Sequence, residues 1–394
     1  MNTHPPNSRR LRPRPNPSPI LPDNLFPEIL SWLPVKSLMQ VKSVSHAWNT
    51  LISDPKFIKM HLHRSAQNPY FWYRDEPHDD YIYNFLHFPV SRVLQNHWIT
   101  VPKDPHFLLN DKDCEEIVGS CNGLVCLLGE EGYNYENVWF RFWNPATRKI
   151  SDKLGYKSSS INCKFVFCYD NSTDIYKVLE LSPSGSSDLQ MKTTVRVFSL
   201  ANNVWRTIPS FPVVPLEVCN PTGADGVHLG CTVNWLANKS EWRNDTIGEF
   251  VILSFDIGRE KYTQLQLPQG FDNDGAPSIC VLKDSLFLYY NDFKKTGLVI
   301  WKMTEFGNEN SWIQFHKVSY DNIHTNYKHA GSRLIKLRPL HLSENGETMV
   351  LTDIIQDRAI LYNLRTNKAK KTRINKKICW FPMKDYVESL VSTS

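Results

Sequence analysis

Two pairs of cysteines have a spacing that would suit zinc ligands. Four residues separate Cys121 from Cys126, and four separate Cys163 from Cys168. Two such pairs would supply the four thiolates of a tetrahedral zinc site. In a β-strand, however, side chains five residues apart point to opposite faces, so Cys163 and Cys168 cannot bind one ion if their segment is a strand. We therefore predict buried structural cysteines and no metal site.

The remaining polar residues show no spacing typical of a catalytic or cofactor site. The 13 histidines include neither a His-x-x-x-His nor a His-Glu-x-x-His arrangement, and the chain has no Gly-x-Ser-x-Gly elbow and no glycine-rich phosphate loop. Acidic pairs such as Asp79-Asp80 and Glu130-Glu131 stand beside turn residues, which fits solvated loops better than acid–base pairs. We predict no catalytic residue and no cofactor, and we rank an oxidoreductase or hydrolase lowest among the functions considered.

Composition indicates an intracellular protein of more than one domain. The 394 residues exceed one average domain. The net charge is +5, but four arginines between residues 9 and 14 precede the first acid, so the rest of the chain is close to neutral and we expect no nucleic-acid binding. Nine cysteines and the lack of an apolar N-terminal signal indicate the cytoplasm, the nucleus or both. No apolar run approaches the roughly 18 residues of a membrane span.

Residues 21–60 are predicted to form three short helices. Asp23 is a candidate cap of the first helix, Pro34 ends it, Ser45 caps the third, and Pro55 follows the end of the third. The apolar side chains with helical spacing are Leu25, Ile29, Trp32 and Leu33 in the first helix, Leu38 and Val41 in the second, and Val44, Trp48, Leu51 and Ile52 in the third. Helices this short cannot bury all of these side chains among themselves, so part of the apolar surface needs a partner.

This stretch resembles the F-box motif of plant F-box proteins almost position by position. The matching segments are Leu21-Pro22, Glu28-Ile29-Leu30, Leu33-Pro34-Val35-Lys36-Ser37-Leu38, Val44-Ser45, Trp48 and Ile52-Ser53-Asp54-Pro55-Lys56-Phe57. Val41, Ser43 and His46 stand where the family commonly has an aromatic residue, a cysteine and a lysine, and these changes leave the apolar face intact. Periodicity alone would equally fit a small helical subdomain packed on the domain that follows.

The resemblance implies that the helices dock on a Skp-type adaptor and, through it, on a cullin. The residues it assigns to adaptor binding are Leu21, Pro22, Leu25, Ile29, Leu33, Pro34, Val35 and Leu38. Those assigned to packing within the F-box are Val41, Val44, Trp48, Leu51 and Ile52.

The rest of the chain is predicted to be mainly β-structure. Residues 1–20, rich in proline and arginine, are expected to be a disordered leader, and residues 61–109 a linker with the first strands. Within residues 110–390 a strand, a polar turn and a second strand recur. The corresponding positions Asn144, Ser199, Asp256, Met303 and Asn363 are 55, 57, 47 and 60 residues apart. A period near 50 residues is typical of β-propeller blades, and a twisted β-sandwich is the alternative.

This second region resembles the F-box-associated domain, related to kelch-type interaction domains, of the same plant family. The matching segments are Gly119-Ser-Cys-Asn-Gly-Leu-Val-Cys126, Trp143-Asn-Pro-Ala-Thr-Arg148, Tyr169-Asp-Asn-Ser-Thr-Asp-Ile-Tyr-Lys-Val178, Val197-Phe-Ser-Leu200 with Trp205-Arg206, and Gly230-Cys-Thr-Val-Asn-Trp-Leu-Ala237. We interpret them as structural, since Asn-Gly and Asp-Asn supply turns. The fold class expected is α+β and multidomain: a three-helix F-box followed by an antiparallel all-β domain.

Two functions from different classes fit these features. The resemblance implies a non-catalytic substrate-recognition subunit of a Skp–cullin–F-box ubiquitin ligase, which would hold an unknown target protein for ubiquitination and proteasomal degradation. The alternative is a propeller that binds a glycan or another ligand without ligase assembly, with loops such as Glu241-Trp-Arg-Asn244 stacking on a sugar.

Overall fold

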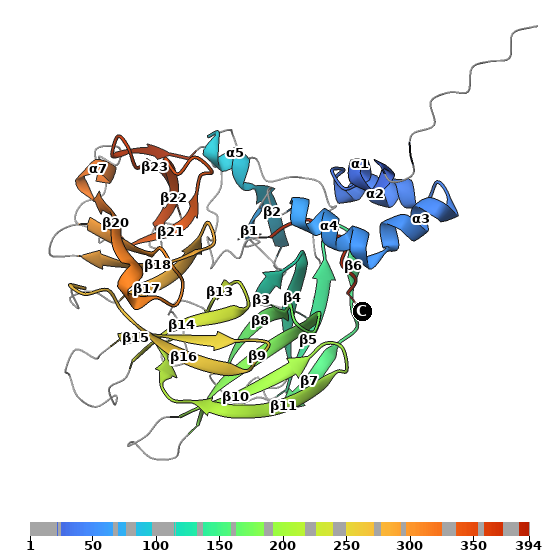
Figure 1. Cartoon of the computed structure of the whole chain (residues 1–394), viewed down its shortest axis with the longest axis horizontal. Coiled ribbons are helices and arrows are strands. Elements are labelled where there is room, and N and C mark those ends of the chain that lie inside the picture. Colours follow the sequence, from blue (N-terminus) through green and yellow to red (C-terminus); the bar gives the residue numbers. More distant parts are fainter. Residues whose placement is uncertain are drawn as a thin grey trace, which may run out of the picture.

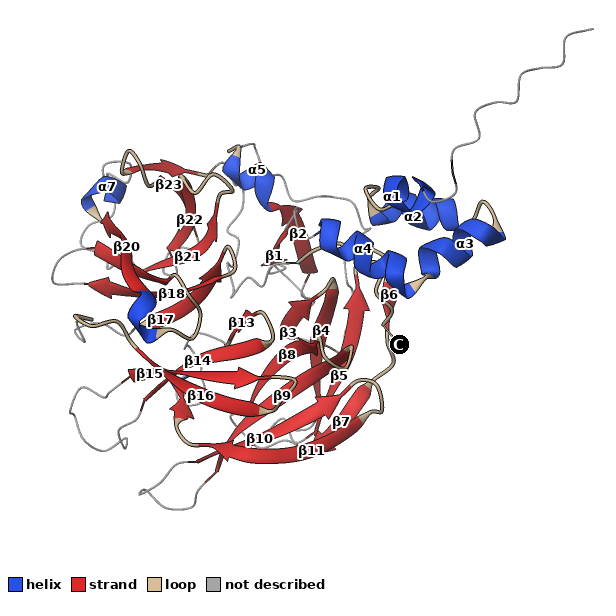
Figure 2. Cartoon of the chain, viewed as in Figure 1, coloured by secondary structure: helices blue, strands red, loops and turns tan. Residues whose placement is uncertain are grey.

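The protein consists of a small helical unit beside a large domain of β-sheets (Figures 1 and 2). The structure is a computed structural model. The residues it describes are 22, 25–65, 70–75, 84–96, 114, 116–131, 137–158, 163–184, 192–216, 226–238, 250–271, 277–292, 297–324, 336–353, 358–372 and 386–393. The predicted leader, Leu21, the Asp23 cap, the Asp79-Asp80 pair and the loop 241–244 lie outside these ranges.

The helical unit has four helices where the sequence predicted three. They are α1 (Leu25–Leu30), α2 (Val35–Lys42), α3 (His46–Ser53) and α4 (Pro55–Ser65). The Ser45 hydroxyl caps α3 as predicted, accepting a hydrogen bond from the Trp48 amide at 3.2 Å. Pro55 follows α3, as predicted, and is also the first residue of α4. Proline suits the first position of a helix. The Asp54 carboxylate before it accepts a hydrogen bond from the Lys56 amide at 2.7 Å. The helical unit therefore continues past residue 60.

The described residues of the β domain form five antiparallel sheets, here called blades 1 to 5, which follow one another along the chain. Blade 1 contains β3 (Glu116–Cys121), β4 (Leu124–Glu131), β5 (Asn137–Asn144), β6 (Lys149–Ile150) and β7 (Leu154–Ser158). Blade 2 contains β8 (Lys164–Asp170), β9 (Ile175–Ser184), β10 (Lys192–Ser199) and β11 (Val204–Phe211). Blade 3 contains β12 (Val214–Pro215), β13 (Val227–Leu229), β14 (Thr232–Asn238), β15 (Phe250–Asp256) and β16 (Lys261–Gln266).

Blades 4 and 5 repeat the same order. Blade 4 contains β17 (Ser278–Leu282), β18 (Ser285–Asp292), β19 (Gly297–Met303) and β20 (Trp312–Ser319). Blade 5 contains β21 (Leu337–Leu342), β22 (Thr348–Asp353), β23 (Arg358–Asn363) and β24 (Lys368–Lys371). The remaining elements are the hairpin β1 (Tyr70–Asp75) and β2 (Asn84–Pro89), the helices α5 (Val90–Leu94) and α7 (Asp321–His324), and the 3-10 turn η2 (Glu309–Ser311).

The sheet order confirms a propeller and not a sandwich. The first strand of blade 1, β3, lies beside the first strand of blade 2, β8, and β17 lies beside both β13 and β21. Blades 1 and 2, 3 and 4, and 4 and 5 therefore meet along strands near the start of each blade, as the blades of a propeller do around its axis.

The predicted repeat corresponds to one position in the blades. Asn144, Ser199, Asp256, Met303 and Asn363 are each the last residue of the third main strand of their blade, in β5, β10, β15, β19 and β23.

Tryptophans at the start of two outer strands join neighbouring blades. The Trp205 indole N–H of β11 donates to the Gly155 carbonyl of blade 1 at 2.9 Å. The Trp312 indole N–H of β20 donates to the Gln266 carbonyl of blade 3 at 3.1 Å. Each of these two tryptophans thus links its own blade to the preceding one.

Residues 386–393, here called the C-terminal segment, return from blade 5 to blade 1. Tyr386 is fully buried in a cluster with Val125, Leu127 and Trp143. These three side chains belong to the face of blade 1 opposite to the one packed on blade 2, where Cys126 and Phe142 lie. Tyr386 of the C-terminal segment thus helps to cover this face of blade 1.

Candidate adaptor-binding surface

The helical unit exposes a set of large apolar side chains. Leu25 is 39% exposed, Ile29 52%, Trp32 64% and Val44 73%. Ile29 follows Leu25 by about one helical turn, and Trp32 follows Leu25 by nearly two. The three side chains therefore lie on the same side of α1 and of the turn after it. Exposed apolar side chains that share one side of a helix indicate an interaction surface. We call Leu25, Ile29 and Trp32 the apolar patch; Val44 is a separate exposed side chain in the turn between α2 and α3.

The predicted adaptor residues divide by exposure. Pro22, Leu25, Ile29 and Pro34 are exposed, and Leu33 is half-buried. The other described members, Val35 and Leu38, are fully buried in a cluster with Leu30, Ile52, Phe57, Ala146 and Leu390. We correct their assignment, because side chains without exposed area serve packing in this structure. Helical spacing identified an apolar face of α2 but not that Ala146 of blade 1 and Leu390 of the C-terminal segment cover it.

The predicted packing residues also need one correction. Ile52 is fully buried, and Val41, Trp48 and Leu51 are half-buried against the same cluster. Val44 instead lies in the turn between α2 and α3 and is the most exposed large apolar side chain among the described residues. Trp32, which the predicted adaptor set omitted although it shares the helical spacing of Leu25 and Ile29, is the next most exposed.

Arg64 of α4 holds the end of α1 and the Trp32 side chain. Its guanidinium donates to the Glu28 carbonyl at 2.7 Å and also contacts the Ser31 hydroxyl and the Glu28 carboxylate. The same group lies 4.7 Å from the centre of the Trp32 ring. The Glu28 carbonyl is one of the last four of α1, which have no partner within the helix, so Arg64 acts as a C-terminal cap. It thereby orders the part of the patch formed by α1 and Trp32.

His61 ties α4 to the loop between α1 and α2. Its buried ring has Nε2 at 3.0 Å from the Leu33 carbonyl, so Nε2 carries the proton, and Nδ1 accepts from the Ser65 hydroxyl at 3.3 Å. Burial lowers the pKa of His61, although the hydrogen bond to Leu33 and the charge of Glu388 act in the opposite direction. The ring is therefore neutral at pH 7 and positions Leu33 by a neutral hydrogen bond.

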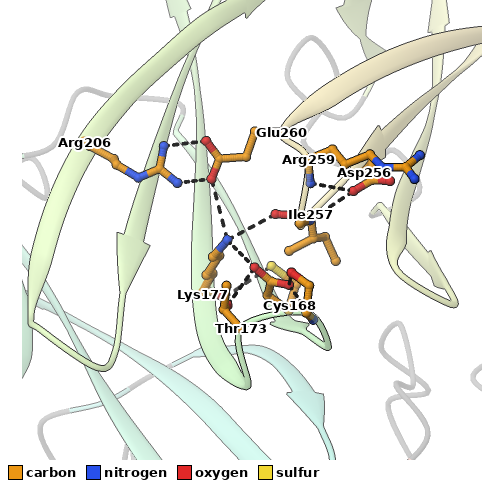
Figure 3. Close-up of polar contacts among 11 residues, drawn as sticks. Cys168, Thr173, Lys177, Arg206, Asp256, Ile257, Arg259 and Glu260 are labelled. Carbon is orange, nitrogen blue, oxygen red and sulfur yellow. Dashed lines mark hydrogen bonds and ion pairs between the residues drawn. The ribbon is translucent and has the colours of Figure 1, made fainter.

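Charged residues that sequence reasoning did not bring together meet between blades 2 and 3 (Figure 3). The Lys177 ammonium donates to the Asp170 carboxylate at 2.7 Å and to the Ile257 carbonyl at 3.1 Å, and lies 3.6 Å from the Glu260 carboxylate. Glu260 also pairs with Arg206. The Asp170 carboxylate accepts in addition from the Ser172 hydroxyl at 2.6 Å.

This cluster is a structural junction between blades 2 and 3. Burial raises the pKa of Asp170, but hydrogen bonds from Lys177, Ser172 and Thr173 outweigh it, so the pKa lies well below its usual value. The Lys177 ammonium donates two hydrogen bonds and lies beside the Glu260 carboxylate, and both oxygens of Asp170 accept hydrogen bonds. These contacts join blades 2 and 3. The junction explains the segment from Tyr169 to Val178 that resembles the F-box-associated domain.

A second buried carboxylate lies between blades 1 and 2. Glu180 pairs with Lys157 of β7 and accepts hydrogen bonds from Ser182 at 2.9 Å and from the Cys163 thiol at 3.3 Å.

The cysteines of the two sequence pairs lie in or beside the strands of blades 1 and 2. The Cys168 thiol is fully buried. Burial raises the pKa of Cys121 to about 12, so the Cys121 thiol stays protonated. Within the described ranges, no three His, Cys, Asp or Glu side chains are placed to hold a metal ion. No helix of the described part of the chain is long and apolar enough to span a membrane.

Comparison with known proteins accounts for both parts of the chain. The family model of the F-box domain matches residues 19–60, and that of the F-box associated beta propeller domain matches residues 89–393. The chain belongs to the F-box-associated β-propeller family. The helical unit is thus its F-box, and the five blades belong to its F-box-associated propeller.

Relatives with the same two parts occur in Arabidopsis thaliana. The F-box/kelch-repeat protein At3g23880 is 26% identical over 315 residues, 74% of this chain and 78% of its own length. The F-box protein CPR1 is 23% identical over 377 residues, 90% of this chain and 84% of its own length. Among solved structures, the β-propeller domain of the Trilobed protease from Pyrococcus furiosus aligns at 12% identity with a TM-score of 0.39, over 76% of this chain and 83% of that chain.

Proposed function

We propose that this protein is the substrate-recognition subunit of a Skp–cullin–F-box ubiquitin ligase. The observation that carries the proposal is the division of the F-box into two faces. One face is buried on Ala146 and Leu390, while α1 and the turn after it expose the apolar patch of Leu25, Ile29 and Trp32. A Skp-type adaptor would cover this patch and link it to the cullin, in the cytoplasm, the nucleus or both.

The propeller would hold the target protein, which is then ubiquitinated and degraded. A receptor of this kind contributes by raising the concentration of the target near the ubiquitin-carrying enzyme, and it needs no catalytic residue of its own. The polar clusters around Lys177 and Glu180 agree with this role, because their hydrogen-bonding groups are used in joining blades. The alternative of a glycan-binding propeller depends on loop 241–244, which lies outside the described residues.

Binding of the full chain to a Skp-type adaptor tests the proposal. The informative variant is the pair Leu25→Asp and Ile29→Asp, because both side chains are exposed and a carboxylate there stays in water in the free protein. On adaptor binding the same carboxylates would lose their hydration, so we expect binding to be lost. The matched control is Ile313→Asp on β20, a side chain that is 49% exposed on the propeller.

Two outcomes show whether the adaptor binds through the apolar patch. Binding of the wild type and of the Ile313→Asp control, with loss in the F-box variant, supports the adaptor surface. Wild-type affinity in a folded Leu25→Asp, Ile29→Asp variant would show that the adaptor does not use this patch. Folding of each variant is checked by circular dichroism and by its melting temperature.

A further inference from the structure

The C-terminal segment is held on blade 1 by two turns that carry sequence motifs of the family. The Asn144 side-chain amide, at the end of β5, donates to the Ser389 carbonyl at 3.0 Å and to the Val391 carbonyl at 2.8 Å. Gly123, in the turn between β3 and β4, has φ of +81°, and a Cβ atom at this position would lie 2.7 Å from the Val387 carbonyl oxygen and would overlap Ser389. The Asn-Gly turn and the Trp-Asn-Pro turn thus form a seat for residues 387–391.

The same segment completes the F-box from the other side. Leu390 is buried in the cluster that contains Val35, Leu38 and Ile52. The Glu388 carboxylate accepts a hydrogen bond from the Val35 amide, the first residue of α2, at 3.4 Å. Pro34, which precedes α2, gives it no side-chain cap. A carboxylate at a helix N-terminus satisfies a free amide and interacts favourably with the helix dipole, so Glu388 supplies the cap that the F-box sequence lacks.

The other links between the F-box and the propeller are weaker. Lys59 of α4 pairs with Asp174 of the β8–β9 turn at 2.8 Å, but both side chains are mostly exposed. Exposed ion pairs contribute little to stability. Ala146, in the turn after Asn144, packs on the F-box core together with Leu390. Among the described residues, the C-terminal segment is thus an element in contact with both the F-box core and the blade 1 turns, next to the direct contact of Ala146.

We propose that residues 386–393 are a positioning element that holds the F-box at a fixed place and angle on the propeller. Glu388 and Leu390 grip the F-box, while Asn144 and Gly123 hold the segment on blade 1. The consequence for ligase assembly rests on the proposed function: the distance from the adaptor to a bound target is then set by this contact and not by a flexible linker. The positioning itself does not depend on any adaptor.

The distance between the F-box and the propeller tests the proposal directly. Nitroxide-bearing unnatural amino acids are introduced at Lys36 on α2 and Lys317 on β20, both exposed, and pulsed electron resonance measures their separation in the full chain. The decisive variant is Asn144→Asp, which keeps the side-chain oxygen that accepts from the Thr147 amide at 3.2 Å but loses both donors to the C-terminal segment. We expect the wild type to give one narrow distance population and Asn144→Asp to lose it.

The matched control is the same substitution at the equivalent position of blade 5. The Asn363 oxygen accepts from the Thr366 amide at 2.8 Å, and Asn363→Asp preserves this bond. A second variant, Leu390→Asp, removes the apolar contact between the C-terminal segment and the F-box core. If Leu390→Asp does not fold, Asn144→Asp still tests the proposal, because it changes no residue of the F-box. One narrow population in a folded Asn144→Asp protein would overturn the proposal.

Adaptor binding separates this proposal from the proposed function. Ile29→Asp is expected to abolish adaptor binding and keep the narrow distance population, because Ile29 lies in the exposed patch. Asn144→Asp is expected to show the reverse: unchanged adaptor affinity and a broad distance distribution. If the wild type does not bind the adaptor, the proposed ligase role alone is refuted, because the distance is measured in the absence of the adaptor.

Discussion

The two faces of the F-box predict opposite effects for two similar truncations. Ile29 is 52% exposed in the apolar patch, whereas Leu38 is fully buried under Ala146 and Leu390. Full burial of such a side chain is worth about 1.5 to 3 kcal/mol, so about half of that, roughly 0.8 to 1.5 kcal/mol, remains to be gained by Ile29 when a partner covers it. Ile29→Ala should therefore weaken adaptor binding about four- to twelvefold.

Leu38→Ala should act on stability and not on affinity. Removing a fully buried leucine leaves a cavity and costs about 2 to 5 kcal/mol of the free energy of unfolding. The loss should be confined to the F-box, because the propeller has separate apolar clusters. The adaptor affinity of the folded fraction should change little, since Leu38 presents no area to a partner.

Two measurements on each full-length variant distinguish the effects. Titration calorimetry with a Skp-type adaptor gives the dissociation constant, and hydrogen exchange of the α2 amides gives the free energy of local unfolding. We expect Ile29→Ala to change mainly the first quantity and Leu38→Ala mainly the second. A folded Leu38→Ala variant that loses more affinity than Ile29→Ala would refute the division of the F-box into a packed face and a docking face.

Three further substitutions test other parts of the structure. Lys177→Met leaves the buried Asp170 carboxylate without its cation and should cost about 3 to 5 kcal/mol, seen as a lower melting temperature, and replacing Asp170 as well should recover part of the loss. Gly123→Ala forces a Cβ atom against Ser389 at a positive φ and should cost about 1 to 3 kcal/mol, measured by urea unfolding. Because burial lowers the pKa of His61 below 6.5, protons bind the unfolded state more strongly. The stability of the F-box, measured by hydrogen exchange, should therefore fall as the pH drops below about 6.5, and less so in His61→Gln.

Local sequence signals predicted the blades well. The repeat at Asn144, Asp256 and Asn363 marked the ends of strands, because each is followed by a tight turn with its own chemistry. The Asn363 side chain caps its turn at Thr366, and Asn122-Gly123 has positive φ at both residues, as a two-residue hairpin requires. These signals are contained within a few residues and need no knowledge of distant contacts.

Distant contacts explain what the sequence did not reveal. Helical spacing placed Leu38 and Val44 on apolar faces, and the resemblance assigned Val35 to adaptor binding, but neither showed which of these side chains the propeller covers. The grip of Glu388 on α2 joins residues 353 positions apart, and no local pattern indicates it. The ion pair of Lys177 with Glu260 likewise depends on the packing of two blades. The blade count followed only from the sheets: beside the two-stranded β1–β2 hairpin, the described residues form five sheets of four or five strands.

The cap on α2 also sets an order of events during synthesis. The F-box leaves the ribosome early, yet the carboxylate that accepts from the Val35 amide belongs to a residue made 353 positions later. At roughly 5 to 20 residues per second, this delay is about 20 to 70 s. Throughout that interval the inward face of α2 lacks Leu390, so its apolar side chains are open to chaperones. A nascent chain interrupted before residue 386 would lack Glu388 and Leu390, so α2 would have neither this cap nor this part of its cover.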